Sequence, residues 1–201
     1  MALDIKPTRS ELIKLKGRIK KTRNGYKLLK MKRDGLFHEF RTLLTEMIAA
    51  KRELTEAYRL AKTRMDLANA IEGGLAVRAA AIANSAHPEV EVERRNIMGV
   101  VVPNVSGSNL RSTFAERGVG FIGSSPYIDE ASDAFGDLIE KMVKAAEMEA
   151  TLKRLLEEIE ATKRRVNALE FKVIPELEEA QVFIKLRLEE MEREETFRLK
   201  R

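Results

Sequence analysis

The sequence predicts a mainly α-helical protein: a long two-helix antiparallel left-handed coiled coil with a small β-hairpin head in the middle of the chain. Three observations predict it. Apolar residues recur at an average spacing of 3.5 from Leu12 to Ile71, and a second apolar stripe runs from Phe135 to Met191. Between the stripes the period changes to two, which is typical of strands.

These patterns divide the chain of 201 residues into three segments. The expected boundaries are 1–72 for the first long helix, 73–124 for a short helix and the hairpin head, and 125–201 for the second long helix. The connection between the helices is long enough for the chain to turn back on itself.

The first long helix carries its stripe on eighteen positions, of which fifteen are apolar or aromatic. A spacing of 3.5 keeps such a stripe against a partner helix as both supercoil left-handedly. About sixty residues of helix span roughly 90 Å, so only a partner of similar length can cover the stripe. Arg33 and Arg64 are charged exceptions on this stripe. They either fix the register of the two helices or turn to solvent.

Local signals mark where the first helices begin and end. Thr8 and Glu11 have the spacing of a capping box, which predicts a helix start. Gly73–Gly74 predicts its end, because glycine readily adopts the left-handed conformation. The alanine-rich stretch Leu75–Ala86 predicts a short helix, which His87 before a proline ends.

The head is predicted from β-branched residues and turn signals. Valines alternate with glutamates over residues 89–93, and residues 97–102 read as a second strand that Pro103 ends. Residues 104–109 have the composition of a loop, and residues 118–122 are a third strand candidate. A lone hairpin is only marginally stable in water, so we expect the head to pack on the long helices or on another subunit.

The second long helix is predicted to start at Ser125–Pro126, with serine at the N-cap and proline at the first helical position. Its stripe slips in phase near Leu155 and near Leu169. We expect a kink or short break near Pro175, because proline removes a backbone hydrogen bond and crowds the preceding turn.

Composition and charge restrict the class of protein. Charged residues make up 34% of the chain, cysteine is absent, and no apolar run approaches the roughly 20 residues that span a bilayer. The net charge is +5, but residues 1–41 alone carry thirteen basic and four acidic side chains. This basic end is either a solvated face or a surface that binds an acidic partner.

No set of residues predicts catalysis. Residues 118–123 have the glycine spacing of a dinucleotide fingerprint, but the helix that should open within the motif starts only near Pro126. His38 and His87 have no histidine or cysteine companions for a metal site. We therefore predict no catalytic residue, no cofactor and no metal, and a protein that is not itself an enzyme.

Four stretches resemble one known family: Pro7–Leu12, Gly25–Asp34, Asn96–Met98, and Thr162–Glu170 with Ile174–Pro175. They are similar to the D subunit of the V/A-type (archaeal-type) rotary ATP synthases, and the resemblance covers nearly the whole chain. It implies the central rotor shaft, whose paired terminal helices enter a hexamer of catalytic and nucleotide-binding subunits. The implied function is to transmit torque between ion flow through the membrane ring and ATP synthesis or hydrolysis.

The resemblance also implies partners and a location. The F subunit and the socket subunit on the membrane ring are the expected partners of the lower part and the head, with no nucleic acid and no direct membrane insertion. The expected location is the cytoplasmic face of the cell membrane, as a peripheral part of the complex.

Two groups of contact residues follow as hypotheses. The hexamer contact is assigned to exposed cations on both long helices: Arg9, Lys14, Lys20, Lys21, Arg23, Lys27, Lys30, Arg164 and Arg165. The partner contact of the head is assigned to its apolar residues: Ile97, Val100, Val101, Val102, Phe121 and Ile122. The alternatives are a basic coiled coil that binds nucleic acid, a tether or scaffold, and a nucleotide enzyme that uses the glycine spacing.

Overall fold

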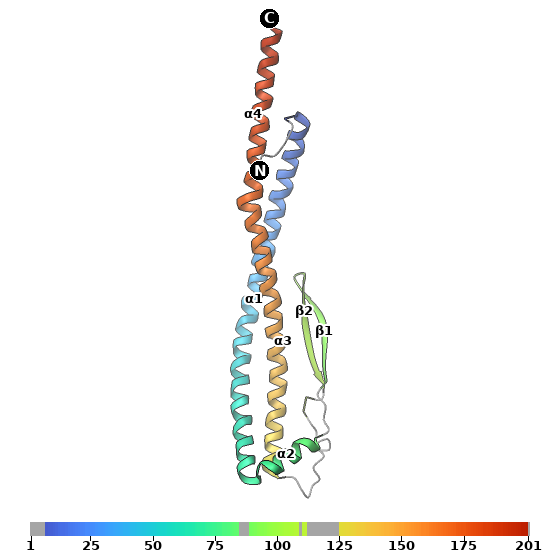
Figure 1. The fold of residues 1–201 in the computed structure, drawn as a ribbon, viewed down its shortest axis with the longest axis vertical. Helices are drawn as coiled ribbons and strands as arrows, with labels where there is room; N and C mark the ends of the chain where they lie inside the picture. Colours follow the sequence, from blue (N-terminus) through green and yellow to red (C-terminus); the bar gives the residue numbers. More distant parts are fainter. Residues whose placement is uncertain (1–6, 85–88, 109, 112–124, 201) are drawn as a thin grey trace. The chain divides into compact units, whose positions relative to one another are not determined.

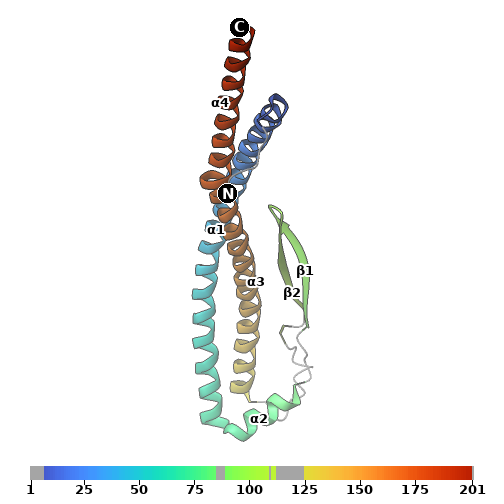
Figure 2. The same cartoon turned by 45° about the horizontal axis from the view of Figure 1, so that its top comes forward.

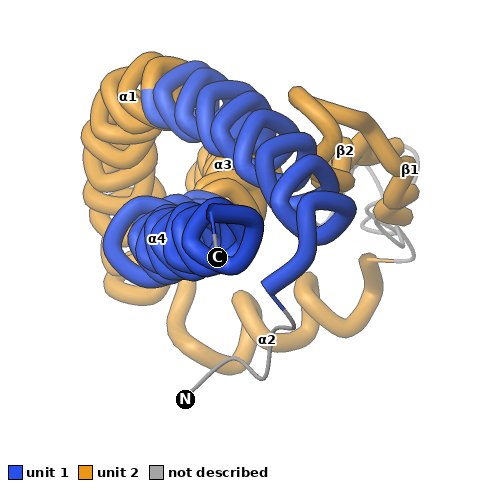
Figure 3. Tube along the Cα trace, turned by 90° about the horizontal axis from the view of Figure 1, so that it is seen from above, with its two compact units in different colours: residues 1–37, 157–201 blue, residues 38–156 orange. Residues whose placement is uncertain are grey.

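The computed structural model describes residues 7–84, 89–108, 110–111 and 125–200. The chain forms two compact units (Figure 3). Unit 1 contains the two ends of the chain, residues 1–37 and 157–201, and unit 2 contains residues 38–156.

Helices dominate the structure, and one hairpin lies mid-chain (Figure 1). The predicted fold class, two long helices packed together with an antiparallel hairpin between them in sequence, is confirmed. The elements in order are α1 (Arg9–Glu72), α2 (Gly74–Ala83), β1 (Glu89–Ile97), β2 (Val100–Ser108), α3 (Pro126–Ala168), a π-helical segment (Leu169–Val173) and α4 (Ile174–Leu199).

Helix α1 begins and ends at the predicted signals. The Thr8 hydroxyl accepts a hydrogen bond from the Glu11 backbone N–H at 3.2 Å, which forms one half of the capping box. The Glu11 carboxylate accepts from Lys14 instead of reaching back to the cap. Gly73, with φ of 80°, ends α1 as predicted. Helix α2 is shorter than the predicted stretch and ends at Ala83.

The start of α3 is also confirmed. Pro126 is its first residue, and the Ser125 hydroxyl accepts a hydrogen bond from the Tyr127 backbone N–H at 3.4 Å. The Ser125 carbonyl accepts from the Ile128 N–H. Proline suits this position because its missing N–H has no partner in the first turn of a helix.

In unit 1 the start of α1 packs antiparallel to the end of the chain. Three ion pairs join the two helical segments: Arg9–Glu192, Arg23–Glu178 and Lys32–Glu158. The residue numbers of the cations rise along α1 while those of their glutamate partners fall, so the two helical segments are antiparallel. Between the ion pairs lies an apolar core of Leu15, Ile19 and Ile184, with Leu12, Leu177, Ala180 and Leu188 packed against it.

In unit 2 the remainder of α1 packs antiparallel to α3. Ala57, Ala61 and Leu138 form the buried cluster there. The small alanines allow the two helix backbones to lie close together. Arg64 is half-buried on the predicted stripe and forms an ion pair with Glu130 of α3, so it fits the register-fixing alternative. Within the described part of the chain, Arg33 pairs only with its own neighbour, Asp34.

The hairpin is longer than predicted and turns at a different place. The two strands pair antiparallel from Glu89 opposite Ser108 to Ile97 opposite Val100. The predicted continuous strand 97–102 is wrong, because Met98 (φ 51°) and Gly99 (φ 86°) form a two-residue turn inside it. Both turn residues have positive φ, the pattern of a type I′ hairpin turn.

Pro103 does not end the second strand, and the predicted loop 104–109 is wrong over residues 104–108, which belong to β2. The register explains why. Ile97 and Val100 flank the two-residue turn as a hydrogen-bonded pair, so residue 103 occupies a position whose N–H points away from β1. A proline there costs no ladder hydrogen bond. Residue 109 and the third strand candidate, 118–122, lie outside the described residues.

The hairpin lies beside α3 in two views (Figures 1 and 2). The Thr151 hydroxyl of α3 donates to the Pro103 carbonyl at 3.5 Å. Val100 and Val102 of β2 are buried, whereas β1 is exposed along its length except at Ile97. The expectation that the head packs on the long helices is confirmed.

A π-helical segment interrupts the long helical stretch of unit 1. The Ile174 N–H donates to the Leu169 carbonyl, five residues back, where an α-helix would have a spacing of four. Pro175 follows at the start of α4, and its ring would clash with the carbonyl four residues earlier in a continuous α-helix. The wide turn relieves that clash at the place where the sequence predicts a kink.

Candidate interaction surfaces

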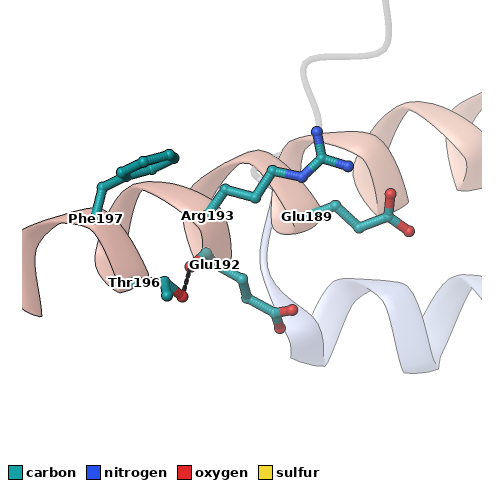
Figure 4. A pocket seen from close by; sticks show the side chains of 5 residues that line it. All are labelled: Glu189, Glu192, Arg193, Thr196 and Phe197. Carbon is teal, nitrogen blue, oxygen red and sulfur yellow. Dashed lines mark hydrogen bonds between the residues drawn. The ribbon is translucent and has the colours of Figure 1, made fainter. Parts of the chain in front are cut away.

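Two hollows on the described part of unit 1 are open, and each is lined from α4 alone. The smaller has a volume of about 320 Å³ and is lined by Glu189, Glu192, Arg193, Thr196 and Phe197. Figure 4 shows these side chains projecting from one helix, with the Thr196 hydroxyl bonded to the Glu192 carbonyl at 2.8 Å. Glu192 also pairs with Arg9, so the hollow is partly an ion-pair site within the chain.

The larger hollow, of about 530 Å³, is lined by Pro175, Glu178, Glu179, Val182, Phe183 and Leu186. A single helix cannot surround a ligand, so neither hollow has the enclosing walls of a small-molecule site. Within the described residues, no group of three histidine, cysteine or acidic side chains could hold a metal ion. None of the helices that the structure describes is long and apolar enough to cross a bilayer.

Four of the nine cations assigned to the hexamer contact interact within the chain. Arg9 and Arg23 pair with glutamates of α4 at 2.5 and 2.7 Å. Lys14 pairs with Glu11 one turn earlier at 2.8 Å, and the Lys30 ammonium lies 5.9 Å from the centre of the Tyr26 ring. These side chains already have partners within the chain, so they are less available to another protein.

The other five cations form an exposed group that we call the free cations: Lys20, Lys21, Lys27, Arg164 and Arg165. None of them forms an ion pair with any residue that the structure describes. Lys27 lies in α1 between Arg23 and Lys32, which form two of the interhelical ion pairs. Arg164 and Arg165 lie in the opposite segment, between Glu158 and Glu178, the partners of those two cations. The same length of the helix pair therefore presents cations from both of its helices.

Sequence reasoning missed the glutamates that hold this pair together. Glu158, Glu178 and Glu192 read as solvated charges, but each reaches a cation on α1. Their position beside the apolar stripe could have indicated this pairing, because charged residues that flank the stripe of a coiled coil form salt bridges with the partner helix. The register needed to match each glutamate with its cation comes only from the structure.

The head residues are placed unequally. Val100 and Val102 are buried in the chain and Ile97 is half-buried, whereas Val101 is 56% exposed. Phe121 and Ile122 lie outside the described residues. Val90 and Val92 of β1, which sequence reasoning did not assign, are exposed on the same face of the hairpin as Val101. Their alternation with glutamates could have indicated that these valines share one face of the strand.

One carboxyl in α3 has a displaced pKa. A hydrogen bond and the charge of Lys153 hold the pKa of the Glu149 side chain below its ordinary value of 4.5. The two residues form an exposed ion pair one helical turn apart, at 3.0 Å. Exposed pairs of this kind contribute little to stability, and the shift marks no reactive group.

The described structure is that of a long helical protein with open helical and strand faces, and neither of the two hollows described above is enclosed. The family of the ATP synthase D subunit matches residues 11–201. The A-type ATP synthase D subunit of Methanoregula boonei is 56% identical over 202 aligned residues, which cover 100% of this chain and 97% of that protein. The chain belongs to the family of ATP synthase D subunits, whose members are central-stalk subunits of rotary ATP synthases.

Two further relatives show the same correspondence. The A-type ATP synthase D subunit of Methanosarcina mazei is 55% identical, over 98% of this chain and 95% of that protein. Its counterpart in Halorubrum lacusprofundi is 48% identical, over 100% of this chain and 88% of that protein. The family assignment replaces the nucleic-acid-binding and tethering alternatives with a subunit of an ATP synthase complex.

Proposed function

We propose that this chain is the non-catalytic shaft of the rotary complex and transmits torque between the membrane ring and a catalytic hexamer. The antiparallel pairing of dissimilar helical segments in each unit supports the proposal. Such a pair has no threefold symmetry, so three catalytic interfaces around it meet different faces. Each interface then changes state by a population shift that differential contact with the shaft drives.

The free cations carry the assignment of the hexamer contact. They are exposed and make no ion pair with the described residues, and they project from both helices of unit 1. Charge attraction is less directional than interlocking apolar packing and acts over about a Debye length, roughly 8–10 Å. A cationic surface can therefore hold the shaft to acidic partners while the shaft turns.

The F subunit and the socket subunit of the membrane ring are the proposed partners of unit 2, with the exposed Val101 side of the head as one contact. The proposed location is the cytoplasmic face of the membrane, as a peripheral part of the complex. ATP is made or hydrolysed on the hexamer in this proposal, and this chain contributes no catalytic residue.

The test is charge reversal at two free cations, Lys20→Glu with Lys21→Glu, in the complete complex. The matched control replaces the same residues by arginine, which keeps the charge. We expect the reversal to weaken assembly or to reduce ion pumping per ATP hydrolysed by about tenfold, which corresponds to losing roughly 1.4 kcal/mol of coupling. The arginine control should pump normally.

Assembly is measured by co-purification with the hexamer, and coupling by ATP hydrolysis and ion uptake in vesicles. Normal assembly and normal coupling in the reversed variant would contradict the assignment of the hexamer contact to these cations. Reduced helicity of the isolated variant would show a folding defect instead, so circular dichroism is measured on both variants.

A further inference from the structure

The outer edge of β1 has unpaired backbone groups at alternate residues. Ile97 and Val100 form the hydrogen-bonded pair next to the turn, so the odd-numbered residues of β1 bond to β2. The N–H and C=O groups of Val90, Val92, Arg94 and Asn96 therefore point away from β2. No described residue bonds to these backbone groups.

The other edge of the hairpin is occupied. The outward-pointing carbonyl of Pro103 accepts the hydrogen bond from Thr151, so the outer edge of β2 faces α3 (Figures 1 and 2). Proline at this position also lacks the donor that a further strand would need. Only the β1 edge is open to an additional strand from outside the described chain.

Few of the devices that usually block an edge strand are present on β1. Edge strands are commonly protected by proline, by bulges, by very short length or by charged side chains, and of these β1 has only the charges. β1 has nine residues in unbroken register with β2, and its sequence EVEVERRNI contains no proline. Val90 and Val92 are also 51% and 64% exposed, which leaves apolar surface uncovered beside the free edge.

The side chains of β1 specify which strand would fit. Glu89, Glu91 and Glu93 alternate with Val90 and Val92, so one face of the strand is acidic and the other apolar. Directly opposed like charges destabilise a strand pair, and opposite charges stabilise it. A second copy of β1 in parallel, in-register pairing would set glutamate beside glutamate, and Arg95 is the one cation on this face, so the acidic run 89–93 favours a basic neighbour.

We propose that the outer edge of β1 is a docking site for an extended strand of another protein in which lysine or arginine alternates with β-branched apolar residues. The strand would add to the hairpin by backbone hydrogen bonds, with its cations beside the three glutamates. This inference concerns unit 2 alone and does not depend on the torque function. Loss of the cationic contact in unit 1 would leave it unchanged.

Amide hydrogen exchange of the full-length chain tests the proposal by NMR. The probe is a capped peptide, Lys-Val-Lys-Val-Lys, compared with Glu-Val-Glu-Val-Glu and with a basic peptide whose central residue is proline. At about ten times its Kd, the basic peptide should slow the outward amides of Val90, Val92 and Arg94 about tenfold. The inward amides of Glu91 and Glu93 should change little, because β2 already protects them.

The matched variant is Glu91→Lys with Glu93→Lys, which should reverse the preference so that the acidic peptide protects the same outward amides. A second variant, Val92→Pro, removes one outward donor without breaking the ladder with β2 and should weaken binding of the basic peptide. Retention of the hairpin in both variants is checked by the inward amides.

Several outcomes would overturn the proposal. These are no protection by either peptide, equal protection by both, or equal binding of the proline-containing peptide, which would show charge attraction without strand pairing. Outward amides that exchange as slowly as inward ones in the free chain would show that another segment of this chain, such as residues 118–122, already covers the edge.

Discussion

Two buried threonines of α3 differ in whether their hydroxyl has a partner. Thr151 is 7% exposed and donates to the Pro103 carbonyl. Thr162 is fully buried, and its hydroxyl has no hydrogen-bond partner among the residues that the structure describes. A buried hydroxyl without a partner costs roughly 1–3 kcal/mol, whereas a satisfied one contributes roughly 0.5–1.5 kcal/mol.

Valine substitution of each threonine should therefore have opposite effects. We expect Thr162→Val to raise the free energy of unfolding by about 1 kcal/mol, because valine keeps the branched shape and removes the unpaired hydroxyl. Thr151→Val should lower it by about 1 kcal/mol and speed amide exchange in β2. Urea unfolding followed by circular dichroism measures both, and a loss of stability in Thr162→Val would contradict the expected sign.

The basic residues show how far single positions can be predicted. Composition alone indicates a basic surface on the first forty residues. It does not separate Lys20 and Lys21, which are free of ion pairs within the described chain, from Arg9 and Arg23, which pair with α4. That distinction depends on the register of two segments more than 150 residues apart in sequence.

Among the elements, the helices were predictable because their signals are local. The apolar period, the Thr8 cap, Gly73 and Ser125–Pro126 each act within a few residues, and the structure has helix ends at each of them. Of the eighteen predicted stripe positions of α1, only Ile71 is exposed. The side chains that pack between the helices recur with the same spacing as the apolar residues in the sequence, so this spacing alone predicts which face of α1 is covered.

The hairpin turn was missed because its residues lack the usual signal. Asn-Gly and Asp-Gly are the common type I′ dipeptides, and here methionine occupies the first position with φ of 51°. Met98 and Gly99 also sit within a run of β-branched residues that reads as one strand. The Asn96 side chain supports the turn by accepting from the Gly99 N–H at 2.8 Å.

Two substitutions test the turn. Met98→Asn should stabilise the hairpin by about 0.5–1 kcal/mol, because asparagine tolerates positive φ better than methionine. Gly99→Ala should destabilise it by about 1–2 kcal/mol, because φ of 86° places a Cβ in a disfavoured conformation. Exchange rates of the inward amides of Glu91 and Glu93 report both changes, and equal rates in the two variants would contradict the type I′ assignment.

For the whole molecule, the order of segments and the uneven charge were readable from the sequence, and the family assignment agrees with both. The two-unit organisation was not predicted. The unit boundaries fall near residues 37 and 156, inside α1 and α3, where the backbone remains helical. Gly35 lies beside the first boundary, but a single glycine inside a helical pattern does not mark a division.

The proposed non-catalytic function predicts that the isolated chain binds no nucleotide. We expect no saturable heat signal when ATP with Mg²⁺ is titrated to about 1 mM, a concentration at which even a weak site would show binding. The described hollows are surfaces of one helix, which cannot enclose a nucleotide. Saturable binding would contradict the proposal, and its loss in Gly120→Ala would direct attention to the glycine pattern at residues 118–123.

The wide turn at Leu169–Val173 has a consequence for how this protein can diversify. Deleting one residue there would restore an ordinary α-helical repeat and leave the later side chains in nearly their present directions, because the wide turn already holds one extra residue. A one-codon deletion is thus tolerated at this place without re-aiming α4, whereas the same deletion elsewhere in α3 or α4 would turn every later side chain by about 100° around the axis.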